Sequence, residues 1–323
     1  MAAVALAGAG AWWLHQPLRV SAPVVELEIE PGTTPRAVAQ AVVQAGVDTD
    51  ARLLYAWFRL SGQDRGIRAG NYEIPQGTTP RSLLNKLVRG EESLRAITLV
   101  EGWTFRQMRA ALAAEENLKP DLQGLSDADV MQALGKPGLA PEGRFFPDTY
   151  TYAKGSSSLA VLRRAAAAMD QRLALAWERR APDTPLRSPD EALILASIVE
   201  KETGQASDRA QVAGVFTNRL RRGMLLQTDP TVIYGVEQAG LRLEGGRLRK
   251  IHLQTDTPWN TYTRPGLPPT PIAMPGKAAL LAAVQPASTQ ALYFVARGDG
   301  SSHFSATLDE HNRAVNRYIR GKP

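Results

Sequence analysis

Residues 24–36 read VVELEIEPGTTPR, and this stretch decides the fold class of the first part of the chain. Over residues 25–30 apolar side chains alternate with three glutamates, which is the period of a β-strand with one buried face. Pro31-Gly32 then ends the strand, and the Thr-Thr-Pro of residues 33–35 predicts a capped helix start with proline in the first turn. A strand followed directly by a helix indicates an α+β fold.

The same turn chemistry returns at residues 77–81, GTTPR, which repeat residues 32–36 at a spacing of 45 positions (77 minus 32). Between the two copies, apolar periodicity predicts helices near residues 36–44 and 51–60, followed by a short strand at 70–74. This strand, helix, helix, strand order resembles a LysM domain, which is a carbohydrate-binding module. The alternative is a structural spacer, because Gly-Thr-Thr-Pro is also ordinary chemistry for a turn from strand to helix.

The overall composition is that of a globular protein and limits the functions that the chain can have. The 323 residues include 44% hydrophobic and 22% charged side chains, and this length suggests two domains. Thirty-eight basic and 32 acidic residues give a net charge of +6. The basic residues are scattered, with the densest clusters at 219–222 and 247–250, so we expect no nucleic-acid partner. The absence of cysteine excludes thiol nucleophiles, disulfides and thiolate metal sites.

The first fourteen residues carry no charge and include the pair Trp12-Trp13. As a helix they would span about 21 Å, and about 27 Å if extended to Leu18, against the ~30 Å hydrocarbon core of a bilayer. Paired tryptophans are typical of a membrane interface, and we expect a membrane anchor over residues 1–19. If translation starts upstream of Met1, the first turns of this anchor are missing from the sequence. A cleaved signal peptide and a buried helix are the alternatives. The anchor and the signal peptide both place the rest of the chain outside the cytoplasm.

The most informative stretch for chemistry is residues 188–204, SPDEALILASIVEKETG. The serine, proline and two acids at its start predict a helix, and the apolar run 192–199 predicts burial on most sides. Glu200 continues this buried face near the helix C-terminus, where low dielectric and the helix dipole both raise the pKa of a carboxyl group. Glu200 is therefore a candidate general acid. The alternative is that Glu200 lies at a solvated helix end and pairs with Lys201. In both cases Glu202, two positions further along the helix, faces away from Glu200.

Other catalytic patterns are missing from the sequence. The four histidines show no metal-ligand spacing, so we expect no metal site, and neither a nucleophile elbow nor a phosphate-binding loop is present. Several segments interleave aromatic residues with Asn, Asp, Gln and Thr, which suits sugar rings because their apolar faces are edged by hydroxyl groups. Rigid turns are the alternative explanation for these segments, which cover residues 142–150, 227–234, 259–262 and 266–269.

Five motifs follow one another in an order that is typical of one family. They are EGRFFPDTY (142–150), ASIVEKET (196–203), VFTNRL (215–220), LQTDPTVIYG (226–235) and NTY (260–262). With them the chain strongly resembles the YceG-like family of endolytic murein transglycosylases, from about residue 24 to the end. Trp259 stands where Tyr is usual in the family, and Thr270 and Met274 interrupt the usual Gly and Asn of the proline-rich loop.

The resemblance implies an α+β architecture with two domains. A small LysM-like β-α-α-β module over residues 20–92 would precede a larger mixed α/β catalytic domain over residues 93–323. It also implies a single-pass protein of the cell inner membrane, anchored by residues 1–19, with its catalytic domain in the periplasm. The implied partners are peptidoglycan glycan strands, peptidoglycan synthases and the membrane.

The resemblance further implies a lytic transglycosylase that cuts nascent glycan strands internally between MurNAc and GlcNAc. Glu200 matches the catalytic glutamate of the family. It would protonate the glycosidic oxygen and then accept the proton of the sugar 6-hydroxyl, which closes a 1,6-anhydro ring. This reaction requires no metal and no organic cofactor. We expect substrate contacts from Lys201, Glu202, Gln227, Asp229, Tyr234, Asn260, Tyr262, Glu142 and Asp148.

Two other functions stay open at the level of sequence. One is a non-catalytic peptidoglycan-binding scaffold, in which the LysM-like module recruits synthesis enzymes. The other is a hydrolytic muramidase, which usually needs a second carboxylate across the bond. No such partner lies beside Glu200 in the sequence, and Glu142, Asp148 and Asp229 are the distant candidates.

Overall fold

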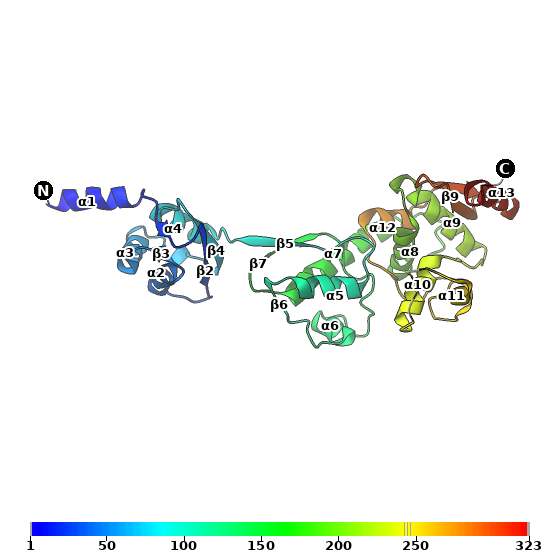
Figure 1. Cartoon of the computed structure of the whole chain (residues 1–323), viewed down its shortest axis with the longest axis horizontal. Helices are drawn as coiled ribbons and strands as arrows, with labels where there is room; N and C mark the ends of the chain where they lie inside the picture. The colour runs from blue at the N-terminus through cyan, green and yellow to red at the C-terminus, as the bar shows by residue number, and fades with distance from the viewer. Residues whose placement is uncertain (1, 242, 244, 246, 322–323) are drawn as a thin grey trace. The chain divides into compact units, whose positions relative to one another are not determined.

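The computed structural model describes residues 2–241, 243, 245 and 247–321. The chain divides into two compact units. One is formed by the chain up to Ala96 together with Thr151–Ser156, and the other by Ile97–Tyr150 together with the chain from Ser157 onward. Figure 1 shows the elements of both units in chain order. The first unit therefore contains a segment, residues 151–156, that a division at 92/93 does not include.

The first unit is built on an antiparallel pair of strands. β2 (Val24–Ile29) pairs with β4 (Gly70–Pro75), with Leu27 opposite Tyr72. Exposed and buried residues alternate along β2, as the pattern over residues 25–30 predicts. A second antiparallel pair consists of β1 (Arg19–Val20) and β3 (Val47–Asp48).

Helices supply the rest of this core. Thr34 and Thr79, the threonines that precede proline in the two Gly-Thr-Thr-Pro turns, each cap a helix with their side chains, as predicted. Leu54 and Phe58 on the second helix are fully buried against Val38 and Leu83 of its neighbours. The elements are α2 (Pro35–Gln44), α3 (Ala51–Leu60), the 3₁₀ turn η1 (Asp64–Gly66) and α4 (Pro80–Arg89).

The prediction of a membrane anchor over residues 1–19 is wrong for the part of the chain that the structure describes. The N-terminal helix α1 spans Ala2–Trp13, so its 12 residues extend about 18 Å, well short of the ~30 Å hydrocarbon core. Among the described residues no helix combines the length and the apolar character that crossing a bilayer requires. The single-pass inner-membrane topology and the periplasmic location rested on that anchor and are corrected with it.

The second unit starts with short helices and one long one. α5 (Phe105–Ala114), α6 (Asp127–Ala133) and α7 (Ser158–Glu178) all begin after a Ser or Thr whose side chain accepts a backbone N–H bond. Two short sheets include strands that cross the division between the units: β5 (Leu94–Thr98) pairs with β7 (Thr149–Ala153), and β6 (Leu118–Lys119) pairs with β8 (Ser156–Ser157).

The core of the second unit surrounds helix α8 (Pro189–Glu202). Ser188 caps it with proline in the first turn, and every residue from 192 to 199 is buried, as the apolar run predicts. α8 is buried on all sides because α7, α9, α10 and α12 pack against it. The remaining elements here are η2 (Ala206–Asp208), α9 (Arg209–Arg221), α10 (Asp229–Gln238), α11 (Lys250–Gln254) and α12 (Lys277–Val284).

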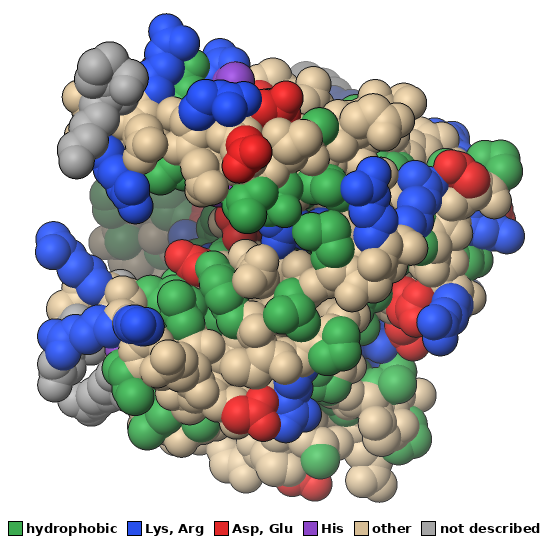
Figure 2. Space-filling view, turned by 90° about the vertical axis from the view of Figure 1, so that its right-hand side faces the viewer, with side chains coloured by type: hydrophobic (Ala, Val, Ile, Leu, Met, Phe, Trp, Pro, Cys, Tyr) green, Lys and Arg blue, Asp and Glu red, His purple; other side chains and the backbone are tan. Residues whose placement is uncertain are grey.

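The C-terminal part of the second unit is a hairpin and a helix, drawn in red in Figure 1. β9 (Tyr293–Ala296) and β10 (Ser302–Ser305) form an antiparallel pair, and α13 (Leu308–Tyr318) packs on both strands. The stacked rings of Tyr293 and His311, 5.2 Å apart, join the strand to the helix. On the face seen in Figure 2, Lys and Arg side chains are dispersed among neutral ones rather than gathered into one patch.

Candidate active site

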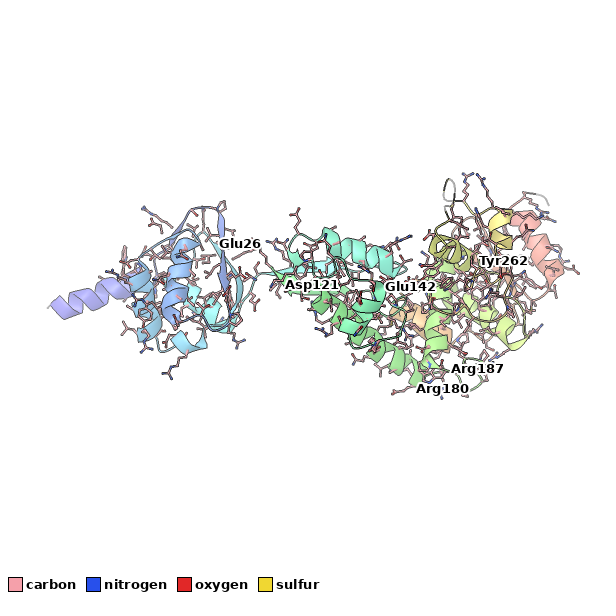
Figure 3. The ribbon with its side chains drawn as sticks, turned by 90° about the horizontal axis from the view of Figure 1, so that it is seen from below. Glu26, Asp121, Glu142, Arg180, Arg187 and Tyr262 are labelled. Atoms are coloured by element: carbon pink, nitrogen blue, oxygen red, sulfur yellow. The ribbon has the colours of Figure 1, made fainter. Side chains whose placement is uncertain are left out.

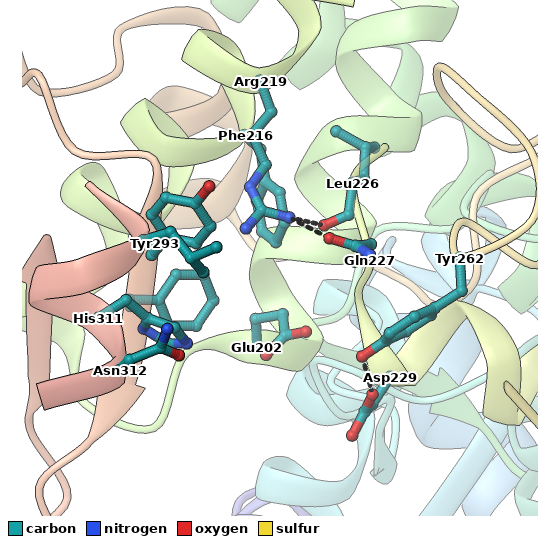
Figure 4. A pocket seen from close by; sticks show the side chains of 12 residues that line it. Glu202, Phe216, Arg219, Leu226, Gln227, Asp229, Tyr262, Tyr293, His311 and Asn312 are labelled. Carbon is teal, nitrogen blue, oxygen red and sulfur yellow. Dashed lines mark hydrogen bonds between the residues drawn. The ribbon is translucent and has the colours of Figure 1, made fainter. Parts of the chain in front are cut away.

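The second unit contains a cavity of about 490 Å³, which we call the Glu202 cavity (Figure 4). Its wall combines the last turn of α8, the inner face of α9, the loop before α10, the start of α10, and residues of β9 and α13. Polar and aromatic side chains alternate around it. The lining residues are Glu202, Phe216, Arg219, Leu226, Gln227, Asp229, Tyr262, Tyr293, Phe294, Leu308, His311 and Asn312.

Glu202 is the carboxylic acid that the end of α8 presents to this cavity. One of its oxygens accepts a hydrogen bond from the hydroxyl of Thr228. Burial raises the pKa of Glu202, the negative charge of Asp229 raises it further, and the Thr228 hydrogen bond opposes the shift. The net effect favours the protonated carboxyl group, which is the form that a general acid needs.

Gln227 lies on the loop that faces Glu202, and its backbone is strained. Its φ of 49° makes it the only non-glycine residue with positive φ in the described part of the chain. Such a conformation costs on the order of 1–3 kcal/mol and persists where surrounding contacts hold it. The contacts are a backbone hydrogen bond from Gln227 to Thr261 O (3.1 Å) and a side-chain bond from Arg219 (3.4 Å).

Arg219 fixes that loop from α9. Its guanidinium group, only 8% exposed, donates to the carbonyl oxygens of Leu292 (2.7 Å), Leu226 (2.9 Å) and Leu225 (3.2 Å). It also lies over the ring of Tyr293 at 5.1 Å. No carboxylate among the described residues forms an ion pair with Arg219. The backbone carbonyls therefore satisfy a buried cation, and the loop takes its shape around it.

Asp229 and Tyr262 form a bonded pair on the opposite side of the cavity. The hydroxyl of Tyr262 donates to Oδ1 of Asp229 at 2.6 Å, and burial followed by this bond raises the pKa of Tyr262. Asn260 holds Tyr262 in place from behind: its Oδ1 accepts the backbone N–H of Tyr262 (2.8 Å), while its Nδ2 donates to Leu253 and Thr255. Asn260 is fully buried and acts through Tyr262 rather than facing the cavity.

Glu200 does not line this cavity. Residues two positions apart on a helix point about 200° apart, and Glu200 faces α12. Its Oε2 accepts the backbone N–H of Gly276, which precedes α12, at 2.9 Å, and its Oε1 lies 4.0 Å from Arg209. Burial is the main cause of its raised pKa, and the Gly276 hydrogen bond is the main opposing effect. Glu200 thus fixes the start of α12 to the end of α8.

The other predicted site residues lie in three places. Gln227, Asp229 and Tyr262 join Glu202 in the cavity, as described. Glu142 and Tyr234 line a second cavity, and Figure 3 shows Glu142 and Tyr262 as separate sites. Lys201 is exposed and donates to Gly102 O (3.3 Å), while Asp148 is exposed and lies 3.6 Å from Arg172. Neither belongs to the lining of the Glu202 cavity.

Several residues of this wall had no predicted role. Arg219 and Phe216 belong to the VFTNRL motif, and Tyr293, His311 and Asn312 lie in the stretch to the chain end that the family resemblance covers. The motifs therefore included these positions without indicating their chemistry. His311 stacks on Tyr293, and burial lowers the pKa of His311, an effect that the positive charge of Arg219 reinforces. Both effects favour the neutral form of the His311 imidazole.

The comparisons with known proteins agree with the motifs. A family model described as the YceG-like family matches residues 27–317. The chain belongs to the YceG-like family. It is 30% identical to the endolytic murein transglycosylase of Bacillus subtilis, an alignment that covers 94% of this chain and 87% of that one.

Two further relatives of this YceG-like chain are informative. The endolytic murein transglycosylase of Streptococcus pneumoniae (strain R6) is 26% identical over 92% of this chain and 59% of its own length. A crystal structure of a yceG-like protein from Listeria monocytogenes superposes with a TM-score of 0.58 at 28% identity, covering 90% of this chain and 98% of that one. The fold described above is therefore similar to a solved YceG-like structure over nearly its whole length.

Proposed function

We propose that this chain is a lytic transglycosylase of peptidoglycan, a lyase that cleaves the MurNAc–GlcNAc bond inside nascent glycan strands. The observation that carries the proposal is Glu202, a carboxyl group with a raised pKa that faces a cavity of about 490 Å³. The names of the Bacillus and Streptococcus relatives support the same substrate. We assign the acid to Glu202 and not to Glu200, since Glu202 lines the cavity whereas Glu200 does not and instead accepts a hydrogen bond from Gly276.

The proposed reaction uses Glu202 twice. Its carboxyl proton goes to the glycosidic oxygen as the C1–O bond breaks and an oxocarbenium-like state develops at C1. The resulting carboxylate then takes the proton of the 6-hydroxyl of the same sugar, and O6 bonds to C1 to close the 1,6-anhydro ring. Glu202 ends protonated as it began, so one residue serves as acid and base.

The remaining polar groups of the cavity would bind and orient the sugar. The amide of Gln227 and the Tyr262–Asp229 pair offer donors and acceptors in the same cavity as Glu202. Asp229 also contributes through its charge, because a neighbouring carboxylate favours the protonated form of Glu202. Arg219 supports the loop that carries Gln227.

A hydrolytic muramidase is the second candidate function, and one observation favours it. Asp229 lines the same cavity as Glu202, and two carboxyl groups flanking a glycosidic bond are the usual equipment of a hydrolase. A non-catalytic scaffold is the third candidate. Product mass separates them: an anhydro end is lighter than the hydrolytic end by one water, and a scaffold yields no product.

We further propose that the first unit is a LysM-like module that binds glycan near the catalytic domain. Its strand, helix, helix, strand order and capped Gly-Thr-Thr-Pro turns support this assignment. With the domains placed at residues 20–92 and 93–323, the module would hold a growing strand while the second domain cuts it. Cutting would then end elongation, and peptidoglycan synthases would be the natural partners.

The experiment that tests the activity uses the full chain and purified glycan strands. We expect products with 1,6-anhydro ends from the parent protein, read by mass spectrometry, and almost none from the Glu202→Gln variant. Products with reducing ends would point instead to the muramidase. Absence of any product from folded parent protein, with binding retained, would point to the scaffold.

A further inference from the structure

A second cavity of the same size, about 490 Å³, lies in the second unit around Glu142. We call it the Glu142 cavity. Its wall comes from α5, the loop before Glu142, the second half of α10 and residues 259 and 270. The residues that bear on its chemistry are Arg106, Glu142, Tyr234, Gln238 and Trp259. None of them lines the Glu202 cavity.

Two aromatic rings on this wall are held in fixed orientations. The indole N–H of Trp259 donates to Oγ1 of Thr270 at 2.9 Å, and its ring meets that of Tyr234 edge to face at 5.4 Å. The hydroxyl group of Tyr234 in turn donates a hydrogen bond to Oε2 of Glu142 at 3.2 Å. Trp259 remains partly exposed, so a fixed aromatic surface is open to a ligand without the entropy cost of ordering it.

Glu142 fixes the orientation of these rings through its hydrogen bonds. It is 4% exposed, and its Oε1 accepts the backbone N–H of Phe105 at 3.0 Å, at the start of α5. It forms no ion pair with any described cation. Glu142 therefore ties the first turn of α5 to Tyr234 on α10, and through Tyr234 it supports the position of Trp259.

The charged groups of the Glu142 cavity are balanced. Arg109 pairs with Asp127 at 2.6 Å, and Arg106 pairs with Glu237 at 2.9 Å. Arg106 and Gln238 are exposed at the rim, where they offer a guanidinium group and an amide. A wall of fixed aromatic rings, balanced charges and rim hydrogen-bonding groups suits a neutral polar ligand with an apolar face, such as a sugar ring, rather than a polyanion.

The two cavities share structural elements. Helix α10 contributes Asp229 to the Glu202 cavity and Tyr234 to the Glu142 cavity, and these positions are separated by about 7.5 Å of helical rise. The segment after α11 likewise contributes Tyr262 to the first and Trp259 to the second. Because five residues turn a helix by about 500°, the two positions on α10 also lie about 140° apart around its axis. A ligand that reaches both cavities therefore passes around α10 from one face to another.

We propose that the Glu142 cavity is a distal subsite that binds an N-acetylated amino sugar of the same glycan strand whose bond lies at Glu202. This inference rests on the proposed function, because it takes the substrate to be a glycan. The subsite adds binding energy for long strands only, since a short oligomer that occupies the Glu202 cavity does not extend to Trp259. It selects for internal bonds of long strands.

The test measures binding as a function of strand length. The full-length Glu202→Gln protein is titrated with peptidoglycan glycan strands of defined length, and the double variant Arg106→Ala/Gln238→Ala is compared in the same background. Both substituted residues are exposed and the Arg106–Glu237 ion pair lies at the surface, so we expect both variants to fold. The matched control is Arg187→Ala/Gln123→Ala, which removes the same two exposed side-chain types away from both cavities.

We expect affinity to rise with strand length in the Glu202→Gln protein and in the control. The double variant should bind long strands about tenfold more weakly than the control and should bind short oligomers with the same affinity. In proteins that keep Glu202, the double variant should raise KM for long strands and leave kcat unchanged.

Equal affinity of double variant and control at every length would overturn the subsite. A free stem peptide whose binding depends on Arg106 and Gln238 would also overturn it, in favour of a peptide site. Failure of the parent protein to bind or cut any glycan would instead overturn the proposed function.

Discussion

Oε2 of Glu200 accepts the backbone N–H of Gly276 at 2.9 Å and so joins the last turn of α8 to the start of α12. A second carboxylate, that of Glu101, also packs against Gly276, where a Cβ would clash with it. The bond satisfies an N–H group at a helix start with a carboxylate, which is favourable for both groups. From this contact we propose a structural role for Glu200.

The first prediction concerns stability at Glu200. Glu200→Ala leaves the N–H of Gly276 without its partner, and we expect a loss of about 1–3 kcal/mol in the free energy of unfolding. Glu200→Gln keeps a carbonyl oxygen that accepts the same N–H, so its unfolding midpoint in urea should stay close to that of the parent. An alanine variant as stable as the parent would show that the contact contributes nothing.

The second prediction concerns catalysis at the end of α8. Glu202→Gln retains size and shape but cannot transfer a proton, and general acid–base catalysis contributes about 10²–10⁴-fold, so we expect kcat to fall by that factor. Glu200→Gln is the matched control on the same helix turn and should retain turnover within about threefold. The measurement is the rate of anhydro-product formation by proteins with unchanged circular dichroism. The opposite result, an inactive Glu200→Gln and an active Glu202→Gln, would return the assignment to Glu200.

Local signals were sufficient for much of the fold. The strand at residues 24–29, the threonine caps and the buried helix after Ser188 all follow from alternation, capping chemistry and apolar runs of neighbouring residues. The choice between Glu200 and Glu202 could not be made in this way. Both lie in the last turn of a helix whose preceding residues are buried all round. Only tertiary packing decides which carboxyl group contacts the start of α12 and which one lines a cavity.

Long-range contacts also explain the residues whose roles were missed. Arg219 lies in one of the two densest basic clusters of the sequence, yet it is buried because carbonyl groups of residues 225, 226 and 292 converge on it. Glu142 belongs to a polar-aromatic segment that suggested a sugar contact, but its carboxylate bonds Phe105, 37 positions earlier in the chain. Periodicity carries no information about partners at such separations.

The third prediction uses the strained backbone of Gln227. Gln227→Gly relieves the positive φ and loses the side chain, so the free energy of unfolding should change by no more than about 1 kcal/mol. Turnover should fall about fivefold or more if the amide binds the sugar, because a hydrogen bond contributes about 1 kcal/mol or more. Gln227→Asn, which tolerates this φ and keeps an amide, should lie between the two. A glycine variant with full activity would contradict a binding role for Gln227.

The last prediction concerns the pH dependence of stability at Glu142. Burial raises the pKa of Glu142 from 4.5 to about 7, whereas the Phe105 and Tyr234 hydrogen bonds oppose the shift. Between pH 4.5 and 7 the folded protein therefore holds a proton that the unfolded chain has lost, so stability must fall as the pH rises through this window. The shift corresponds to a loss of up to about 3 kcal/mol in the free energy of unfolding, complete above pH 7.

Glu142→Gln stays neutral and can still accept the N–H of Phe105, so its stability should not show this fall. Other groups titrate equally in both proteins, and the difference between their urea midpoints from pH 5 to pH 8 isolates Glu142. A difference that stays constant with pH would mean that the carboxyl group is already ionised in the folded protein at pH 5.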